Sequence, residues 1–317
     1  MPDLPKKPET KTFEVGIQPW KAAVHASILA NGESHRTADS PMPDVAVVGS
    51  LVERLRWLAF PGFFGPRVVD LPSLEKHIDG LLDELRALLF GQMEAAFAYD
   101  PVGSHGCQAS EARRRASEAL EGFLERIPAV RSLLAEDATA AYQGDPAMHH
   151  LDEAILCCPG VSALIVHRFA HELHLRSVPL IPRMMSEISH AATGIDIHPG
   201  AVIGRRMFID HGTGVVIGET TRIGEGCRLY QGVTLGAKRL EVDETGRIRR
   251  GYRRHPTIED DVTIYAGATI LGEDTVIGRG SVVNGSVFVT SSVPAGSVVS
   301  GPNLEIRMRQ READRVR

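Results

Sequence analysis

The chain has 317 residues, of which 43% are hydrophobic and 24% are charged, and its formal net charge is −5. This balance is typical of a folded globular protein, and the negative charge argues against a nucleic-acid binder that relies on overall positive charge. All apolar runs are shorter than the about 20 residues that a transmembrane helix needs.

The N-terminal residues and the cysteines bear on the cellular compartment. No apolar segment follows the charged residues near Met1, so no secretory signal is expected. The four cysteines, Cys107, Cys157, Cys158 and Cys227, lack the C-x-x-C spacing of a metal site. We therefore expect a reduced, cytoplasmic protein without a bound metal.

The first two regions of the chain differ in composition and in hydrophobic pattern. Residues 1–44 are rich in Pro, Lys, Glu, Ser and Thr, which predicts a mobile tail with one weak helix around Trp20–Leu29. In residues 45–191, apolar side chains such as Leu51 and Leu55 recur at the spacing of an amphipathic helix. This second stretch predicts an all-α domain of six to eight helices.

Residues 192–300 show a six-residue period. Aliphatic side chains recur, with two slips of register, at Ile197, Ile203, Ile209, Ile217, Ile223, Leu229, Leu235, Ile258, Ile264, Leu271, Ile277, Val283 and Val289. The slips are expected between Ile209 and Ile217 and between Ile264 and Leu271. Small or β-branched residues follow many of these positions four residues later. A coil with three flat faces explains this period, because each face then contributes one inward aliphatic residue and one small corner residue.

The alternative of an ordinary all-β domain fits poorly, because hairpin strands alternate with a period of two. We therefore expect an α+β protein, in which a helical domain precedes a parallel β-helix of hexapeptide repeats. A loop over residues 237–256 interrupts the repeats, and residues 301–317 form a charged C-terminal tail.

Short polar motifs break the pattern that packing alone would select. They are GDPA at 144–147, DIHP at 196–199, DHGTG at 210–214, GET at 218–220 and RRHP at 253–256. In this order, behind a helical region, they resemble the serine O-acetyltransferases, a family of hexapeptide-repeat acyltransferases, and in particular a subgroup with a longer loop. The resemblance covers roughly residues 145–299. It implies left-handed coils and transfer of acetyl from acetyl-CoA to the L-serine hydroxyl, giving O-acetyl-L-serine and CoA, the first step of cysteine biosynthesis from serine.

This chemistry needs a base, because the serine hydroxyl must lose its proton as it attacks the thioester directly. A neutral histidine, with an ordinary pKa of about 6.5, suits this role, and a carboxylate beside it would orient the ring. By resemblance, His211 is the general base and Asp196 is the carboxylate behind it. Their separation of 15 residues is close to one coil of 18, so successive coils could bring them together.

The substrate is a zwitterion, so its site needs both signs of charge. The resemblance assigns Arg254 and His255 to the carboxylate of serine, and Asp145 and Asp210 to its ammonium and hydroxyl groups. A purely structural interpretation remains for Asp145, which could cap a helix that begins at Pro146. Glu219 in the GET motif could likewise serve only the backbone at the register slip.

Acetyl-CoA is the expected co-substrate. The resemblance points to Gly236 and Ala237 at the start of the inserted loop, and to Ala266 and Gly267 in a later coil. Small residues there would let the pantetheine arm lie close to the backbone. In the family the site is completed at the seam between neighbouring protomers of a trimer, so we expect a homo-oligomer, a trimer or a dimer of trimers.

The C-terminal residue is relevant to a complex with a second enzyme. Many relatives end in Ile, whose carboxylate-bearing tail enters the active site of the O-acetylserine sulfhydrylase, whereas this chain ends in Arg317. We therefore do not expect a sulfhydrylase complex formed in that way. No nucleic-acid or membrane partner is expected.

Other functions stay open at this point. A nearer variant is an acetyltransferase for another hydroxylated acceptor, such as homoserine. A second is an inactive regulatory partner of the sulfhydrylase. A third is a zinc enzyme of the γ-carbonic-anhydrase type, for which His198, His211 and His255 would have to converge on one ion.

Overall fold

The computed structural model describes residues 19–31, 42–67, 70–99 and 108–302. Contacts divide the chain into two units, residues 1–41 and residues 42–317. In the first unit the described element is α1 (Pro19–Ala30), whose residues are all exposed. The helix predicted around Trp20–Leu29 is thus confirmed. Most of the two predicted tails lies outside the described residues.

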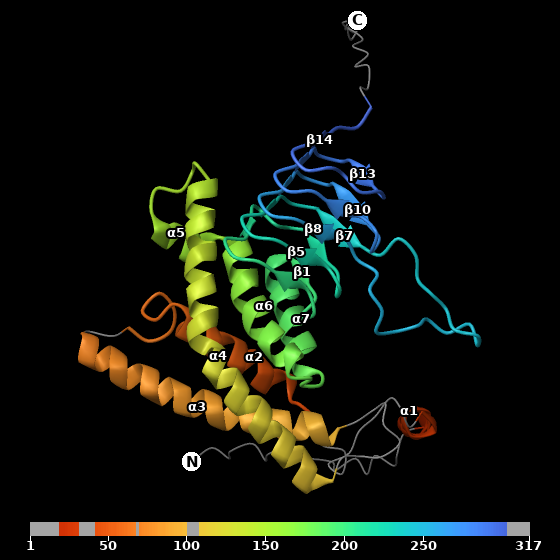
Figure 1. Cartoon of the computed structure of the whole chain (residues 1–317). Coiled ribbons are helices and arrows are strands. Elements are labelled where there is room, and N and C mark those ends of the chain that lie inside the picture. The colour runs from red at the N-terminus through yellow and green to blue at the C-terminus, as the bar shows by residue number, and fades with distance from the viewer. Residues whose placement is uncertain (1–18, 32–41, 68–69, 100–107, 303–317) are drawn as a thin grey trace, which may run out of the picture. The chain divides into compact units, whose positions relative to one another are not determined.

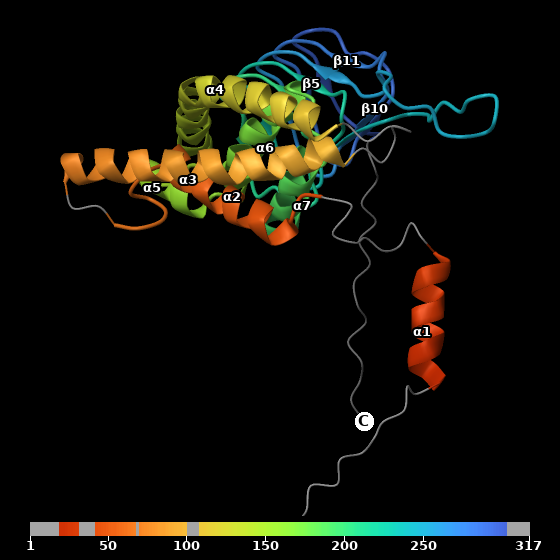
Figure 2. The ribbon, with the colours of Figure 1, turned by 90° about the horizontal axis from the view of Figure 1, so that it is seen from below.

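Among the described residues, six helices form the first part of the second unit, within the predicted six to eight (Figure 1). They are α2 (Val45–Ala59), α3 (Leu71–Ala98), α4 (Ala109–Gly144), α5 (Leu151–Cys157), α6 (Pro159–Leu175) and α7 (Ile181–Thr193). The Asp44 carboxylate caps α2 by accepting hydrogen bonds from backbone N–H groups, and Asp70 caps α3 in the same way. Fully buried apolar side chains such as Leu85 and Phe169 join the helices in one core. Figure 2 shows α3 and α4 side by side in this core.

The short helix α5 and the helix α6 meet at Cys158 with a bend of 70°. No single helix of the described residues is long and apolar enough to cross a membrane. This bent pair reaches the necessary length and hydropathy only when both helices are taken together. Most residues of α6 are buried inside the protein, as in the core helix of a globular domain.

Fourteen short strands follow, and they form three parallel sheets (Figure 1). The first sheet has the order β1-β4-β7-β10-β13, the second β11-β8-β5-β2, and the third β14-β12-β9-β6-β3. The strands are β1 (Asp196–Ile197), β2 (Val202–Ile203), β3 (Phe208–Ile209), β4 (Val216–Ile217), β5 (Arg222–Ile223), β6 (Arg228–Leu229), β7 (Thr234–Gly236), β8 (Thr257–Ile258), β9 (Thr263–Ile264), β10 (Thr269–Leu271), β11 (Val276–Ile277), β12 (Val282–Val283), β13 (Phe288–Val289) and β14 (Val298–Val299). From β1 to β13, successive strands thus belong to successive sheets, as the six-residue period predicts. Between β13 and β14, an isolated bridge from Val293 to Ile277 takes the place of a strand in the second sheet.

A column of aliphatic side chains fills the inside of the coils. One predicted position is wrong: the inward residue of β10 is Ile270, which is fully buried, whereas Leu271 is partly exposed. Ile270 lies six residues after Ile264, so no slip occurs there. The extra residue instead falls in the next corner, before Ile277, because a turn can absorb it without moving a buried side chain.

Two of the corners between sheets matter for the site. At the entry corner the chain passes from the third sheet into the first, at residues 210–215, 230–233, 265–268 and 284–287. At the exit corner it passes from the first sheet into the second, at residues 198–201, 218–221 and 272–275 and through the loop 237–256. Figures 1 and 2 both show this loop projecting away from the coils.

The helices hold the first coil through a buried ion pair. The Arg168 guanidinium on α6 donates hydrogen bonds to both carboxylate oxygens of Asp137 on α4, at 2.6 and 2.9 Å. It also donates to the backbone carbonyls of Ile203 and Gly204, and Asp137 accepts the Met207 N–H at 2.9 Å. Every partner is thus satisfied, and the backbone between β2 and β3 is fixed to the helices.

Candidate active site

The site begins at the entry corner between β3 and β4. This corner has six residues, 210–215, whereas the corner before β3 has four, 204–207. The two additional residues confirm the slip predicted between Ile209 and Ile217. They form a sharp turn in which His211 takes a positive φ of 57° and Gly212 one of 80°. Such a conformation is costly for a residue with a Cβ, and it turns the His211 side chain outward, where 69% of it is exposed.

Two glycines bring the helices to this corner. Gly144, the last residue of α4, lies against the Phe208 ring, and a Cβ on it would come within 2.5 Å of that ring. Gly160 in the first turn of α6 lies against Ile209, where a Cβ would come within 2.1 Å of the carbonyl oxygen. Asp145 follows Gly144 directly, so the close packing on β3 carries it to the corner that holds Asp210.

Asp145 does not cap the start of a helix. It is the C-cap residue of α4, and its carboxylate accepts the Ala147 N–H at 2.8 Å, while the next helix begins at Leu151. The capping interpretation is therefore wrong. The side chain is only partly buried and remains open to a ligand.

Negative charge gathers at the entry corner. Asp210 lies beside the base candidate, with 3.7 Å between its Oδ2 and the Nε2 of His211. Burial raises the pKa of the Cys158 thiol, and the nearby carboxylates of Asp210 and Asp145 raise it further. The two predicted carboxylates thus act on one buried group, although they come from different parts of the chain. Such a pair suits a cationic ammonium group.

Two tyrosines extend this corner along the next coils. The rings of Tyr230 and Tyr265 stack with centroids 5.0 Å apart. Burial raises the pKa of Tyr230, and Tyr265 and Asp210 add to this effect. Sequence reasoning missed both residues, and their equivalent places directly after β6 and β9 are the signal that could have found them.

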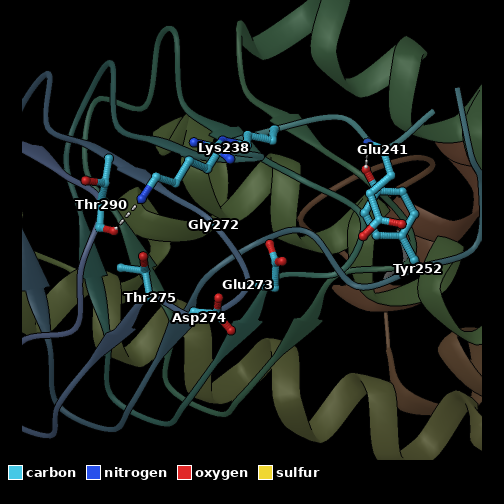
Figure 3. A pocket seen from close by; sticks show the side chains of 9 residues that line it. Lys238, Glu241, Tyr252, Gly272, Glu273, Asp274, Thr275 and Thr290 are labelled. Atoms are coloured by element: carbon cyan, nitrogen blue, oxygen red, sulfur yellow. Dashed lines mark hydrogen bonds between the residues drawn. The ribbon is translucent and has the colours of Figure 1, made fainter.

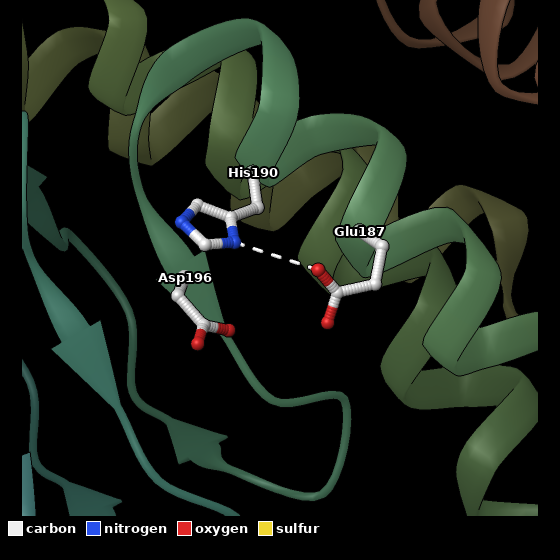
Figure 4. Close-up of side chains that lie close together, drawn as sticks. All are labelled: Glu187, His190 and Asp196. Carbon is white, nitrogen blue, oxygen red and sulfur yellow. Dashed lines mark hydrogen bonds and ion pairs between the residues drawn. The ribbon is translucent and has the colours of Figure 1, made fainter.

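Asp196 lies at the start of β1, one coil before the His211 turn. The structure records no hydrogen bond between the Asp196 and His211 side chains. Instead, Asp196 comes close to Glu187 and His190 of α7, and the ligand-type atoms of the three lie within 4.8 Å of one another (Figure 4). Spacing alone would allow a metal ion there. Glu187, however, is already paired with Arg183 and with the His190 ring, so the group carries no metal assignment.

A second group of polar side chains lies at the exit corner. The Arg254 guanidinium donates to the Glu219 carboxylate at 2.6 Å, and both side chains are largely buried. His255 is 6% exposed, and its Nδ1 accepts the Thr220 N–H at 3.1 Å. Burial is the main cause that lowers the pKa of His255 to about 4, and the Arg254 charge is the second. Burial likewise lowers the pKa of the neighbouring His198 to about 4.

The residues predicted to bind CoA are also divided between the entry corner and the exit corner. Gly236 ends β7 and Ala237 begins the inserted loop, both at the exit corner, whereas Ala266 and Gly267 lie at the entry corner. A cavity of about 370 Å³ follows Ala237 (Figure 3). It is lined by Lys238, Arg239, Glu241, Tyr252, Gly272, Glu273, Asp274, Thr275 and Thr290. The Lys238 ammonium donates to the Thr290 carbonyl across it, at 3.2 Å.

Within one chain, therefore, the predicted site residues form two groups and not one. The strands of the first sheet begin at the corner of Asp145, Asp210 and His211 and end at the corner of Arg254 and His255. The histidines considered for zinc divide likewise, because His211 lies at the entry corner while His198 and His255 lie at the exit corner. They do not converge on one ion within a chain.

The comparisons with known proteins agree on one family, although no protein-family model matches the chain. A relative named "Serine acetyltransferase, plasmid" from Synechococcus elongatus is 46% identical over 262 residues, which are 82% of each chain. A serine acetyltransferase of Bacillus subtilis is 46% identical over 169 residues, 53% of this chain and 73% of the relative.

Solved structures show the same likeness. Serine acetyltransferase 1 of Entamoeba histolytica, in complex with L-cysteine, has a TM-score of 0.68 and 37% identity over 78% of this chain and 85% of that one. Isoform 3 from the same organism, in complex with cysteine, has a TM-score of 0.69 and 29% identity over 91% of this chain and 94% of that one. The predicted fold class, helices followed by a left-handed parallel β-helix, is confirmed.

Proposed function

The chain belongs to the serine acetyltransferase family, and from this premise we propose how its residues transfer an acetyl group from acetyl-CoA to the hydroxyl of L-serine. The observation that carries the proposal is the division of the site residues between two corners of the coil. Each corner supplies one half of what a zwitterionic acceptor needs. The entry corner brings carboxylates and a histidine, and the exit corner brings a guanidinium.

His211 acts as the general base. Its imidazole takes the proton of the serine hydroxyl while the hydroxyl oxygen attacks the carbonyl carbon of the thioester. The tetrahedral intermediate then collapses, the C–S bond breaks, and the thiolate of CoA leaves with the proton that His211 has taken. The open, exposed position of His211 gives the ring access to a bound acceptor. Asp196, one coil away, is the proposed carboxylate behind it.

The charged ends of serine bind at opposite sides of this site. Asp145 and Asp210 receive the ammonium group, and Arg254 binds the carboxylate with its planar fork of donors. Glu219 holds the same guanidinium at 2.6 Å and keeps it oriented. A cavity of about 300 Å³ adjoins the pair and is lined by Glu219, Leu240, Ile248, Arg249, Arg250, Gly251 and Arg254. Its three arginines favour an anionic group.

We propose that the two halves meet between neighbouring copies of the chain, in a trimer, because the first sheet separates them within one copy. The entry corner of one protomer would then face the exit corner of the next. Acetyl-CoA would lie along the same seam, beside Gly236 and Ala237 of one protomer and Ala266 and Gly267 of the other. The phosphates of CoA carry negative charge, and Lys238 and Arg239 supply cations directly after Ala237.

The test is the release of CoA thiol from acetyl-CoA, measured with L-serine, with homoserine and without an acceptor. Serine-dependent release is expected in the wild type, and His211→Ala should lower kcat by about 10²- to 10⁴-fold, as the loss of a general base does. His25→Ala, at an exposed position on α1, is the matched control and should retain full activity.

Two other outcomes of this assay would point to a different function. Release with homoserine at a higher kcat/KM than with serine would assign a different acceptor. No release with any acceptor from the folded protein would contradict the enzyme and favour the regulatory partner.

A further inference from the structure

The Gly218–Thr220 segment lies one coil before His255 at the exit corner and contacts it directly. Two atoms of Thr220 contact the histidine and the backbone of the loop that carries it. The Thr220 N–H donates to Nδ1 of His255 at 3.1 Å, and the Thr220 Oγ1 lies 2.9 Å from the same nitrogen. The Thr220 hydroxyl also accepts the backbone N–H groups of Arg254 and His255, at 3.0 and 3.2 Å.

These contacts determine where the protons are. A backbone N–H can only donate, so Nδ1 of His255 must offer a lone pair. The Thr220 oxygen already accepts two N–H groups, which leaves its own proton directed at Nδ1. A neutral imidazole carries one proton, and that proton must then be on Nε2.

The opposite edge of the His255 ring, which carries Cδ2 and Nε2, packs tightly against Gly218. A Cβ on Gly218 would lie 2.1 Å from Cδ2 and 2.2 Å from Nε2 of His255, so only a glycine lets the ring take this place. Among the hydrogen bonds of the described residues, Nε2 has no protein partner, and it is not a buried atom. The charged and titratable groups that face the ring are Arg254, Glu219 and His198.

We infer that Thr220 is a positioning residue that fixes His255 as the neutral tautomer with its proton on Nε2, so that His255 serves as a hydrogen-bond donor to an oxygen of the bound substrate and neither as a base nor as a cation. The donor role rests on the proposed function, because it assumes that the substrate binds at this corner. The tautomer itself follows from hydrogen bonds between residues of the protein. Burial and the Arg254 charge, which lower the pKa of His255, act in the same direction.

The first test reads the tautomer directly, by NMR of protein labelled with ¹⁵N-histidine, with the His255 signals identified by their loss in His255→Gln. A Nδ1 signal of the lone-pair type and a Nε2 signal of the N–H type are expected near pH 7. A protonated Nδ1 would overturn the inference, whether or not the protein is active. Absence of serine-dependent turnover with the expected tautomer would contradict the proposed function alone.

The second test separates the two ring nitrogens by substitution. The amide of Gln reaches about as far as Nε2 and that of Asn about as far as Nδ1, so His255→Gln should keep a kcat/KM for serine at least about tenfold above that of His255→Asn. Equal or reversed values in folded proteins would contradict the donor role.

The third test addresses Thr220. Thr220→Val keeps the shape but removes the hydroxyl, and it should lower kcat/KM about 10- to 100-fold, while Thr220→Ser restores most of the loss. Thr245→Val, in the inserted loop 237–256, removes a hydroxyl that bonds only within a turn and should change kcat/KM less than twofold. A loss at Thr220 without any change in the His255 ring signals would assign Thr220 a merely structural role.

Discussion

At the scale of single residues, the Asp137–Arg168 pair shows how the helices control the first coil. Both side chains are almost fully buried, and their hydrogen bonds reach either the partner or the backbone from Ile203 to Met207. A buried charge that loses its partner keeps the whole cost of desolvation. Removal of either side chain should therefore be costly, and together they tie the backbone that leads into β3 to the helices.

Asp137→Asn should lower the free energy of unfolding by about 3 kcal/mol, because it leaves the Arg168 charge without a counterion. Glu118→Gln is the matched control, since Glu118 pairs with Arg114 on an exposed helix face. It should cost at most about 0.5 kcal/mol. Urea denaturation of both variants measures the difference, and equal losses would show that the buried pair adds no stability.

His255 makes the stability depend on pH. Its pKa is about 4 in the folded chain, because of burial and then of Arg254, against an ordinary value of about 6.5 in the unfolded chain. Between these values the unfolded state binds more protons, so stability is complete above pH 6.5 and is lost as the pH falls toward 4. From pH 7 to pH 5 this histidine should cost about 2 kcal/mol.

Denaturation of the wild type and of His255→Gln at both pH values isolates this contribution. The wild type should lose about 2 kcal/mol more than the variant over the same interval, because glutamine does not titrate. Parallel losses would mean that His255 takes up its proton equally well in the folded and unfolded chains.

At the scale of elements, the site depends on how closely α6 approaches β3. The first turn of α6 has a glycine at the point of contact, and its missing side chain lets the helix lie directly on the Ile209 carbonyl. That carbonyl belongs to the peptide bond that leads into Asp210. A wider spacing between α6 and β3 would thus shift the turn that presents His211.

Gly160→Ala should lower the free energy of unfolding by about 1–3 kcal/mol, the range for overpacking a core. It should also lower kcat, because Asp210 and His211 follow Ile209. Gly91→Ala in α3 is the control, since its Cβ would meet nothing within 4 Å, and it should raise stability by about 0.5–1 kcal/mol. A neutral Gly160→Ala would show that the helix can move away without consequence.

At the scale of the whole molecule, the question is whether the two corners act within one protomer or between two. Hybrid oligomers answer it. His211→Ala damages only the entry corner and His255→Ala only the exit corner. In a 1:1 co-expressed mixture, a seam joins two intact corners with a probability of about one quarter, so about a quarter of wild-type activity should return.

The control is a mixture of the two variants assembled separately, which should show only their residual activities. If co-expression also restores nothing, both corners must belong to one site within a single chain, and the proposed seam would be wrong.

The sequence predicted the architecture well because a hexapeptide coil repeats its constraint on every face. The six-residue spacing of Ile197, Ile203 and Ile209 follows directly from that geometry. The spacing failed at β10, where Ile270 and Leu271 are both aliphatic and a single chain offers no way to choose between them. Only packing distinguishes them, because one is fully buried and the other partly exposed.

The site was less accessible to sequence reasoning. Its motifs named the chemistry, but the contact between Thr220 and His255 joins residues 35 positions apart, across an inserted loop. No period links them. The approach of Asp196 to Glu187 and His190 was hidden for a similar reason, because it depends on how α7 turns into β1 at Gly194.

The inserted loop joins the coil in a way that leaves the pairing of the strands unchanged. The chain leaves the coil after Gly236 and returns at Thr257, where Ile258 pairs with Ile223 as if no residue had been added. The Thr220 hydroxyl holds the end of the loop, just before β8, by accepting the N–H groups of Arg254 and His255. Insertions and deletions in residues 237–252 therefore leave the solenoid and the His211 turn untouched. This segment can therefore change in length and sequence during evolution independently of the coils. A different acceptor preference can arise there while His211 is kept as the base.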